Sequence, residues 1–360
     1  MAMLIGQAVK SSRRELGLSS TTLAQQAGVS EDDLADLEDG HRSLTASALM
    51  RLARAMGLAP TVFLTDAGAR TAKPVLDRAK FFHATDAPVL SEADVVAIAR
   101  EVTRAQVFAE LAGPRVHLDD YAPTKPGGKP WRNGYDLATT LRLQLGLVSE
   151  PIPSVQRLLE DEFGILVAKH AFADSKLRAV AVRAPQGRLI MVSKRLPTAL
   201  FRISLAHELC HHACDLHPNE SLGETDEVSL EGFSGTEPGK EQRAKAFAVM
   251  FLAPSALVRE LLGPPIHQFA TAPKALGAAS RLAVRCGMGI AASLWHLFHL
   301  KYLTDSEDDV QVWQRHVPSE ALLTGFEPSF GDQDGLSRAI DAALVAEEID
   351  ADQAERLRSL

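Results

Sequence analysis

Residues 205–217, LAHELCHHACDLH, concentrate side chains that bind metal ions: four histidines, two cysteines and a glutamate. Within this stretch, residues 207–211 have the pattern H-E-x-x-H. Each residue of a helix advances by about 100°, so His207 and His211 lie about 40° apart on one face and can bind one zinc ion. Glu208 would flank the metal and accept a proton from a water molecule. The apolar neighbours favour this interpretation over a chance match in a buried helix.

The other candidate ligands of the stretch are ranked lower by helix geometry. Cys214 lies about 20° from His207 around the helix but about 10 Å along its axis, too far for a shared metal. Cys214 and Cys210 are therefore expected to pack in the core. His212 is either a donor near the metal or a surface residue. His217, after the helix, either turns back toward the metal or lies at the surface. The oxyanion stabiliser stays unassigned between these two histidines.

A third protein ligand has to come from another element. Catalytic zinc has three protein ligands and a water molecule, whereas structural zinc has four protein ligands, usually with more thiolates. The helix KEQRAKAFAVMFLAP, which follows a polar loop, has Glu241 in its first turn. His207, His211 and Glu241 with an open fourth position would form the catalytic pattern.

The segments around the motif predict an α+β domain at residues 131–260. The runs ILVAKH, LRAVAVRA and GRLIMVS alternate or are rich in β-branched residues, which indicates strands. YDLATTLRLQLGL, PIPSVQRLLEDEFG and FRISLAHELCHHACDLH have apolar residues at helical spacing. A small sheet with helices is typical of the α+β class.

The rest of the chain predicts a multidomain protein. Residues 1–66 have the spacing and the glycine-ended helices of an all-α domain. Residues 67–130 are predicted to be a helical connector and linker. They include a helix that begins at the capping-box-like sequence SEAD and ends at Gly113. This helix either packs on a neighbouring domain or forms the seam of a homodimer. Residues 261–360 predict a helical C-terminal region.

The sequence resembles two known families. LGLSSTTLAQQAGVSEDDLADLEDG, followed by LMRLARAMGL, is similar to the helix-turn-helix domain of Xre/Cro-type repressors. F-R-x-S-L-A-H-E-L-x-H, with E-x-x-A-x-x-F-A-x-x-F-L-A-P about thirty residues later, resembles the ImmA/IrrE family of metallopeptidases. The second resemblance covers about residues 131–260 and includes the two helices before the motif.

The metallopeptidase resemblance implies a zincin-like fold in which Zn²⁺ is bound by His207, His211 and Glu241, with Glu208 as the catalytic base. It also implies a protein substrate, an Xre-type repressor or an antitoxin-like partner, whose cleavage switches on stress-response or mobile-element genes. One position departs from the family, which usually has glycine where this chain has Cys210. A small thiol fits there, and it could also let oxidants modify the site.

The helix-turn-helix domain would place its second helix, residues 30–39, in the major groove of DNA. This helix has six acidic residues and no basic one, and residues 1–66 have six Lys or Arg against eight Asp or Glu. DNA binding depends on neutralising phosphates. The domain therefore either binds DNA through a few side chains or binds the similar fold of a partner repressor. The candidate DNA contacts are Ser20, Thr21, Ser30, Arg13, Arg14, Arg42 and Arg51.

Composition limits the class and location of the protein. A length of 360 residues predicts two or three domains, and a net charge of −8 argues against a general nucleic-acid coat. Three cysteines cannot make a disulfide framework, which fits a reducing compartment. We expect a cytoplasmic protein without a signal peptide or a membrane span.

Three functions fit these patterns. The first is a zinc-dependent metalloendopeptidase, coupled to transcriptional regulation, that cleaves a repressor or antitoxin-like partner. The second is a DNA-binding transcriptional regulator whose peptidase-like domain acts as a sensor. The substitution Glu208→Gln would abolish the first function and spare the second. The third is an antitoxin-type interaction protein. A toxin gene adjacent to the gene of this protein would favour this interpretation.

Overall fold

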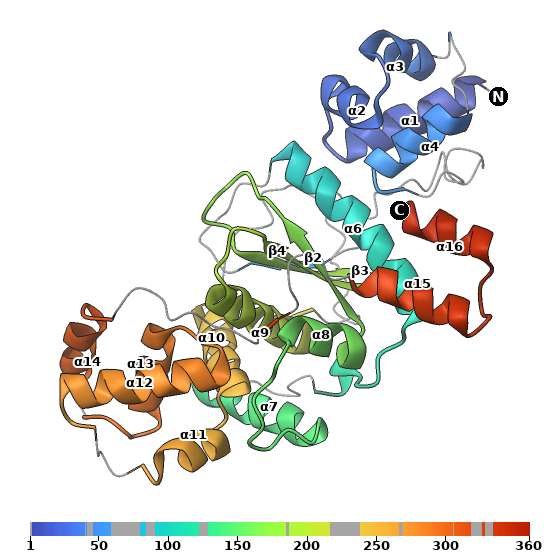
Figure 1. The fold of residues 1–360 in the computed structure, drawn as a ribbon. Helices are drawn as coiled ribbons and strands as arrows, with labels where there is room; N and C mark the ends of the chain where they lie inside the picture. The colour runs from blue at the N-terminus through green and yellow to red at the C-terminus, as the bar shows by residue number, and fades with distance from the viewer. Residues whose placement is uncertain are drawn as a thin grey trace.

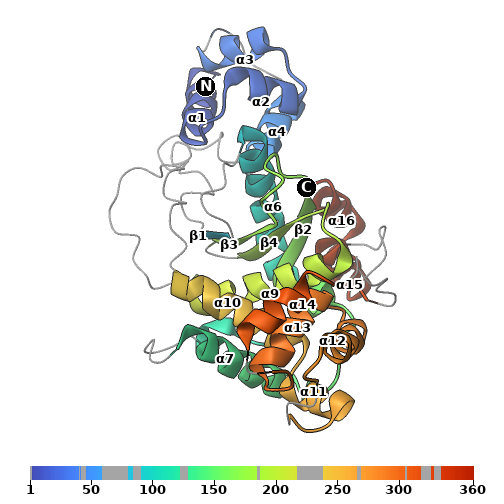
Figure 2. The same ribbon diagram turned by 90° about the vertical axis from the view of Figure 1, so that its left-hand side faces the viewer.

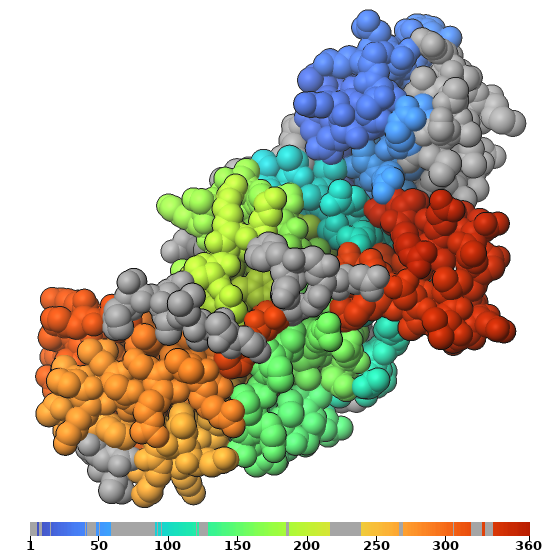
Figure 3. Space-filling model, viewed as in Figure 1, coloured from blue at the N-terminus to red at the C-terminus, as the bar shows by residue number. Residues whose placement is uncertain are grey.

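The computed structural model describes a multidomain arrangement of helices around one sheet (Figure 1). The described residues are 2–39, 41, 46–58, 80–83, 91–121, 129–184, 187–216, 238–265, 269–304, 306–317, 326–327 and 334–360. In the space-filling view the described parts form an elongated body, with the N-terminal helices at one end and α11–α14 at the other (Figure 3). None of the described helices has the length and apolar content that crossing a membrane requires.

Four helices form the N-terminal domain: α1 (Ala2–Glu15), α2 (Ser20–Ala27), α3 (Glu31–Glu38) and α4 (Ala46–Ala55). Ser19 and Ser30 cap α2 and α3 by accepting backbone N–H groups, as serine does at helix starts. Gly6 allows α1 to approach α3 closely, because a Cβ there would lie 1.8 Å from the carbonyl oxygen of Leu37. The expected all-α helix-turn-helix arrangement is therefore present.

Helix α6 (Glu92–Leu111) joins this domain to the sheet. Ser91 and Asp94 form the capping box that the sequence predicted. Val96 belongs to the core of the N-terminal domain, and the Thr103 hydroxyl donates to the carbonyl oxygen of Gly57 at 2.6 Å. The helix then packs along one face of the sheet, which favours the packed interpretation of this segment over a dimer seam.

The sheet has the order β1-β3-β4-β2, with β1 (Lys80–His83), β2 (Ile165–His170), β3 (Ala179–Ala184) and β4 (Gly187–Ser193). Strands β2 and β4 are parallel, and the other two pairs are antiparallel. The sequence predicted β2, β3 and β4 but missed β1, which falls in a segment expected to be irregular. Alternation divides β4 between two cores: Leu189 and Met191 face α6, whereas Ile190 and Val192 face the helices on the other side.

The helices on that second face include α7 (Pro130–Gln144), α8 (Val155–Phe163), α9 (Thr198–Cys214) and α10 (Pro238–Leu252), and a 3-10 turn (Leu118–Tyr121) lies beside them. Figure 2 shows α9 and α10 side by side below the sheet, with α7 beyond α10, and α9 contacts the sheet as well as α10. The sequence predicted all four helices.

The C-terminal helices share both cores. Four of them join the core that contains α9: α11 (Ser255–Leu262), α12 (Ala272–Cys286), α13 (Ile290–His299) and α14 (Glu307–Gln314). The last two, α15 (Gly335–Val345) and α16 (Ala351–Arg358), join the core that contains α6. The region is helical, as expected, but the boundary predicted at residue 260 lies inside a continuous hydrophobic core.

Candidate metal centre

Helix α9 carries the H-E-x-x-H motif through the centre of the protein. Almost every residue from Ala199 to Ala213 is buried, because the helix has the sheet on one side and α8 and α10 on others. A helix that is apolar on most of its surface is expected to lie in a core. The polar side chains of the motif therefore lie in an environment of low polarity.

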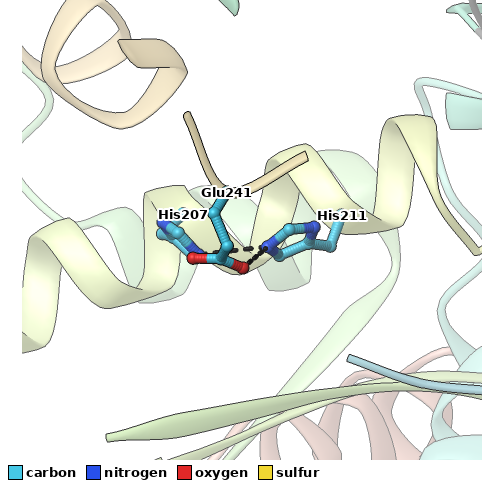
Figure 4. Close-up of side chains that lie close together, drawn as sticks. All are labelled: His207, His211 and Glu241. Atoms are coloured by element: carbon cyan, nitrogen blue, oxygen red, sulfur yellow. Dashed lines mark hydrogen bonds and ion pairs between the residues drawn. The ribbon is translucent and has the colours of Figure 1, made fainter. Parts of the chain in front are cut away.

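Three side chains of the predicted site meet at one point (Figure 4). Nε2 of His207 and Nε2 of His211 lie 3.0 Å apart on α9. The two carboxylate oxygens of Glu241, on α10, lie 3.5 Å from these nitrogens, one oxygen facing each histidine. His207 is 7% exposed and Glu241 is 8% exposed, so little solvent reaches the group.

The spacing and the chemistry of these donors fit a zinc ion. Two ligands about 2.0–2.1 Å from a tetrahedral zinc lie about 3.3 Å apart, close to the separations of 3.0 and 3.5 Å found here. Both Glu241 oxygens are buried without a hydrogen-bond partner among the described residues. Buried carboxylate oxygens need a partner, and a cation would provide one. Two imidazoles and one carboxylate suit zinc.

A close helix contact sets the position of Glu241. Gly134 of α7 packs against α10, and a Cβ at this position would lie 2.2 Å from the carbonyl oxygen of Arg243. Alanines and phenylalanines on the inner side of α10, Ala244, Phe247 and Phe251 among them, fill the core beside α9. These contacts hold the first turn of α10 over the two histidines.

The two histidines have different electrostatic surroundings. Burial lowers the pKa of His207 to about 4, against the opposing effect of Glu241. Burial acts in the same direction on His211, but the hydrogen bond with Asp215 and the nearby carboxylate of Glu241 outweigh it and raise its pKa to about 8. Burial would raise the pKa of Glu241, yet the two histidines together hold it well below the usual range. Glu241 is therefore ionised and available to a cation.

Asp215, which sequence reasoning missed, orients His211. Its Oδ2 accepts a hydrogen bond from Nδ1 of His211 at 2.8 Å, and its Oδ1 accepts one from Arg243 at 2.6 Å. This pairing holds a proton on Nδ1 and orients the ring so that Nε2 faces Glu241, an arrangement common around zinc-bound histidines. The i,i+4 spacing of His211 and Asp215 was the available indication.

Glu208 lies beside these residues with an unpaired carboxyl group. It is 1% exposed, and neither oxygen has a hydrogen-bond partner among the described residues. Burial raises the pKa of this carboxyl to about 8. A buried acid with such a pKa next to a possible metal site is typical of functional groups.

The remaining residues of the motif stretch face other neighbours. His212 is fully buried and its Nε2 donates to the carbonyl oxygen of Leu189 at 3.1 Å, so it is anchored to β4. Cys210 is buried in the core and Cys214 packs against it, in the packing roles expected of both. His217 lies outside the described residues.

Several candidate DNA contacts have partners within the protein. Arg13 forms a bidentate ion pair with Glu38, in which Nε and Nη2 donate to the two carboxylate oxygens at 2.6 and 2.7 Å. The Thr21 hydroxyl donates to Glu31, and Ser30 is occupied as the cap of α3. The other candidates are Ser20, which is half-buried, Arg14 and Arg51, which are exposed, and Arg42, which lies outside the described residues.

Two family models match the chain. The IrrE N-terminal-like domain of peptidase family M78 matches residues 160–288, and a helix-turn-helix domain matches residues 4–63. The chain therefore carries both domains in the order that the sequence predicted. The first match extends to the end of α12, in agreement with the continuous core. No curated protein and no solved structure matches the chain.

Proposed function

We propose that this fusion of a helix-turn-helix domain with an IrrE N-terminal-like domain is a zinc-dependent metalloendopeptidase. One observation carries the proposal: His207, His211 and Glu241 converge on one point, and the buried carboxyl of the adjacent Glu208 interacts electrostatically with His211 and Glu241 and has no hydrogen-bond partner among the described residues. Burying an unpaired carboxyl costs free energy that a purely structural metal site does not require. Three protein ligands also leave the fourth position that a catalytic zinc keeps open.

The chain's own residues supply the proton transfers of peptide hydrolysis. When bound, Zn²⁺ supplies positive charge that polarises the scissile carbonyl and acidifies a water molecule. The positive charge beside Glu208 would favour its ionised form, so that Glu208 accepts the proton of this water on a carboxylate oxygen and passes it to the amine nitrogen that leaves. Asp215 keeps the His211 ring in the orientation in which Nε2 faces the site.

The proposed substrate is an Xre-type repressor or an antitoxin-like protein. Support comes from the helix-turn-helix domain on the same chain, which relates the peptidase to gene control. Exposed acidic side chains on α3, Glu31, Asp32 and Asp36, make this helix better suited to a basic protein surface than to phosphates. DNA is the second proposed partner of residues 1–66, with the exposed Arg14 as a contact.

The test uses the repressor or antitoxin-like protein encoded beside this gene. Zinc-loaded protein should cut it at a defined peptide bond, identified by mass spectrometry, and chelation should stop the cleavage until zinc is restored. The variant His211→Gln should lose both zinc and cleavage. His316→Gln, which changes an exposed histidine after α14, is the matched control and should keep both. An intact substrate with the zinc-loaded wild type would contradict the proposal.

A further inference from the structure

A cavity of about 510 Å³ lies between the helix-turn-helix domain and the body that contains the sheet. Arg51 and Arg54 of α4, Arg100 of α6 and His170 at the end of β2 line it. The described lining residues include no aspartate or glutamate. The cavity is therefore a basic site in a chain whose net charge is −8.

The arginines of this cavity keep N–H groups available. Arg51 donates from Nε to the carbonyl oxygen of Ala27 at 2.9 Å, and no other bond of its guanidinium is seen within the described chain. Arg100 pairs with Glu101, which Arg104 also binds. The Arg54 side chain has neither a hydrogen bond nor an ion pair to any described residue, and its backbone carbonyl accepts from the N–H of Gly57. Arg51 and Arg54 therefore have no carboxylate partner among the described residues. Like charges that line one cavity repel one another, and an anion would remove this cost.

The position of the cavity favours a small ligand over DNA. Figures 1 and 2 both show α3, the helix expected to enter the major groove, on the side of its domain away from the sheet, whereas α4 faces α6. A duplex on α3 would not reach the space between α4 and α6. The rest of the wall is formed by Gln26 and by apolar side chains, Ala55 and Val96 among them, and the apolar part suits an organic moiety.

We propose that this cavity binds a small organic anion through a phosphate or carboxylate group held by Arg51, Arg54 and Arg100. Guanidinium groups bind both kinds of group with paired hydrogen bonds. The volume lies within the range of small-molecule pockets, which often form at domain interfaces. Because the ligand contacts α4, α6 and β2 together, its binding fixes the helix-turn-helix domain on the peptidase body.

Titration calorimetry on metal-free, full-length protein tests the site, because metal removal excludes binding at the zinc ligands. The probes are pyrophosphate, adenosine monophosphate and citrate, with adenosine as the uncharged control. At least one of the anions should bind with a stoichiometry near one, and adenosine should not bind. A comparison of citrate with the two phosphates identifies the preferred anionic group.

Matched arginine variants locate the binding. Arg54→Gln, which removes no described bond, should raise the dissociation constant at least about tenfold. Arg100→Gln is the second variant, because Arg104 still binds Glu101 in it. Arg285→Gln, on the exposed side of α12, should bind as the wild type does. The proposal is overturned if no anion binds at millimolar concentration, or if binding is unchanged in both Arg54→Gln and Arg100→Gln.

Discussion

His211 is held between two carboxylates, Asp215 at Nδ1 and Glu241 at Nε2. The carboxylate of Asp215 fixes the orientation of the imidazole ring, and the carboxylate of Glu241 lies next to the nitrogen that would bind the metal. Arg243 bonds Asp215 from α10, so the same interaction also connects the two helices that carry the ligands. A substitution at Asp215 should therefore affect the metal more than its distance from the metal suggests.

Asp215→Asn should weaken zinc binding by about 10–100-fold, because the orienting partner of a zinc-bound histidine loses its charge. Competition with a chelator of known affinity measures this change. Asp119→Asn is the matched control. Asp119, like Asp215, accepts from two side chains, here Arg183 and Arg188, but it contacts no predicted ligand. Equal zinc affinities of the two variants would show that Asp215 does not orient His211.

Helix packing sets the geometry of the centre at the scale of elements. Glu241 lies 30 residues from His211 in sequence, and the contacts of α10, chiefly with α7 and α9, bring them together. One close contact is at Gly134, where backbone approaches backbone.

Gly134→Ala should move the first turn of α10, because its Cβ cannot coexist with the carbonyl oxygen 2.2 Å away. We expect a loss of about 1–3 kcal/mol of stability from overpacking and weaker zinc binding. Gly277→Ala, in an open part of helix α12, is the control and should be neutral or slightly stabilising. Denaturant unfolding and zinc titration measure both effects, and identical behaviour of the two variants would contradict this explanation.

Local patterns predicted the elements whose periodicity is strong. The alternation of β4 and the helical spacing of α9 are properties of the sequence itself, and so is the spacing of His207 and His211. Strand β1 was missed because four residues in an irregular segment become a strand only by pairing with β3. The ion pair of Arg202 with Glu327 joins residues 125 apart, which no local pattern encodes.

At the scale of the whole molecule, helices α11–α14 and the domain that contains α9 form one body. His296 of α13 donates from Nε2 to the carbonyl oxygen of Ala253 and accepts from the Tyr135 hydroxyl at Nδ1. Only the neutral imidazole satisfies both bonds. Burial accordingly lowers the pKa of His296 to about 4.

This pKa predicts a loss of stability on acidification. Since the unfolded histidine has a pKa of about 6.5, the unfolded state binds more protons between about pH 6.5 and pH 4. The free energy of unfolding should fall as the pH is lowered through this window, by up to about 3 kcal/mol from this group. His296→Gln should flatten the dependence, measured by denaturant unfolding at several pH values, whereas His316→Gln should not. A dependence unchanged in His296→Gln would refute this role.

The proposed peptidase activity depends most directly on Glu208. The decisive measurement compares wild type with Glu208→Gln, both loaded with zinc, on the neighbouring repressor, with zinc content determined in the same samples. The expected result is equal zinc in both proteins and a cleavage rate at least about 100-fold higher for the wild type than for Glu208→Gln, as the loss of a general base predicts. Equal cleavage by both, or an intact repressor with both, would contradict a metallopeptidase that uses Glu208 as its base.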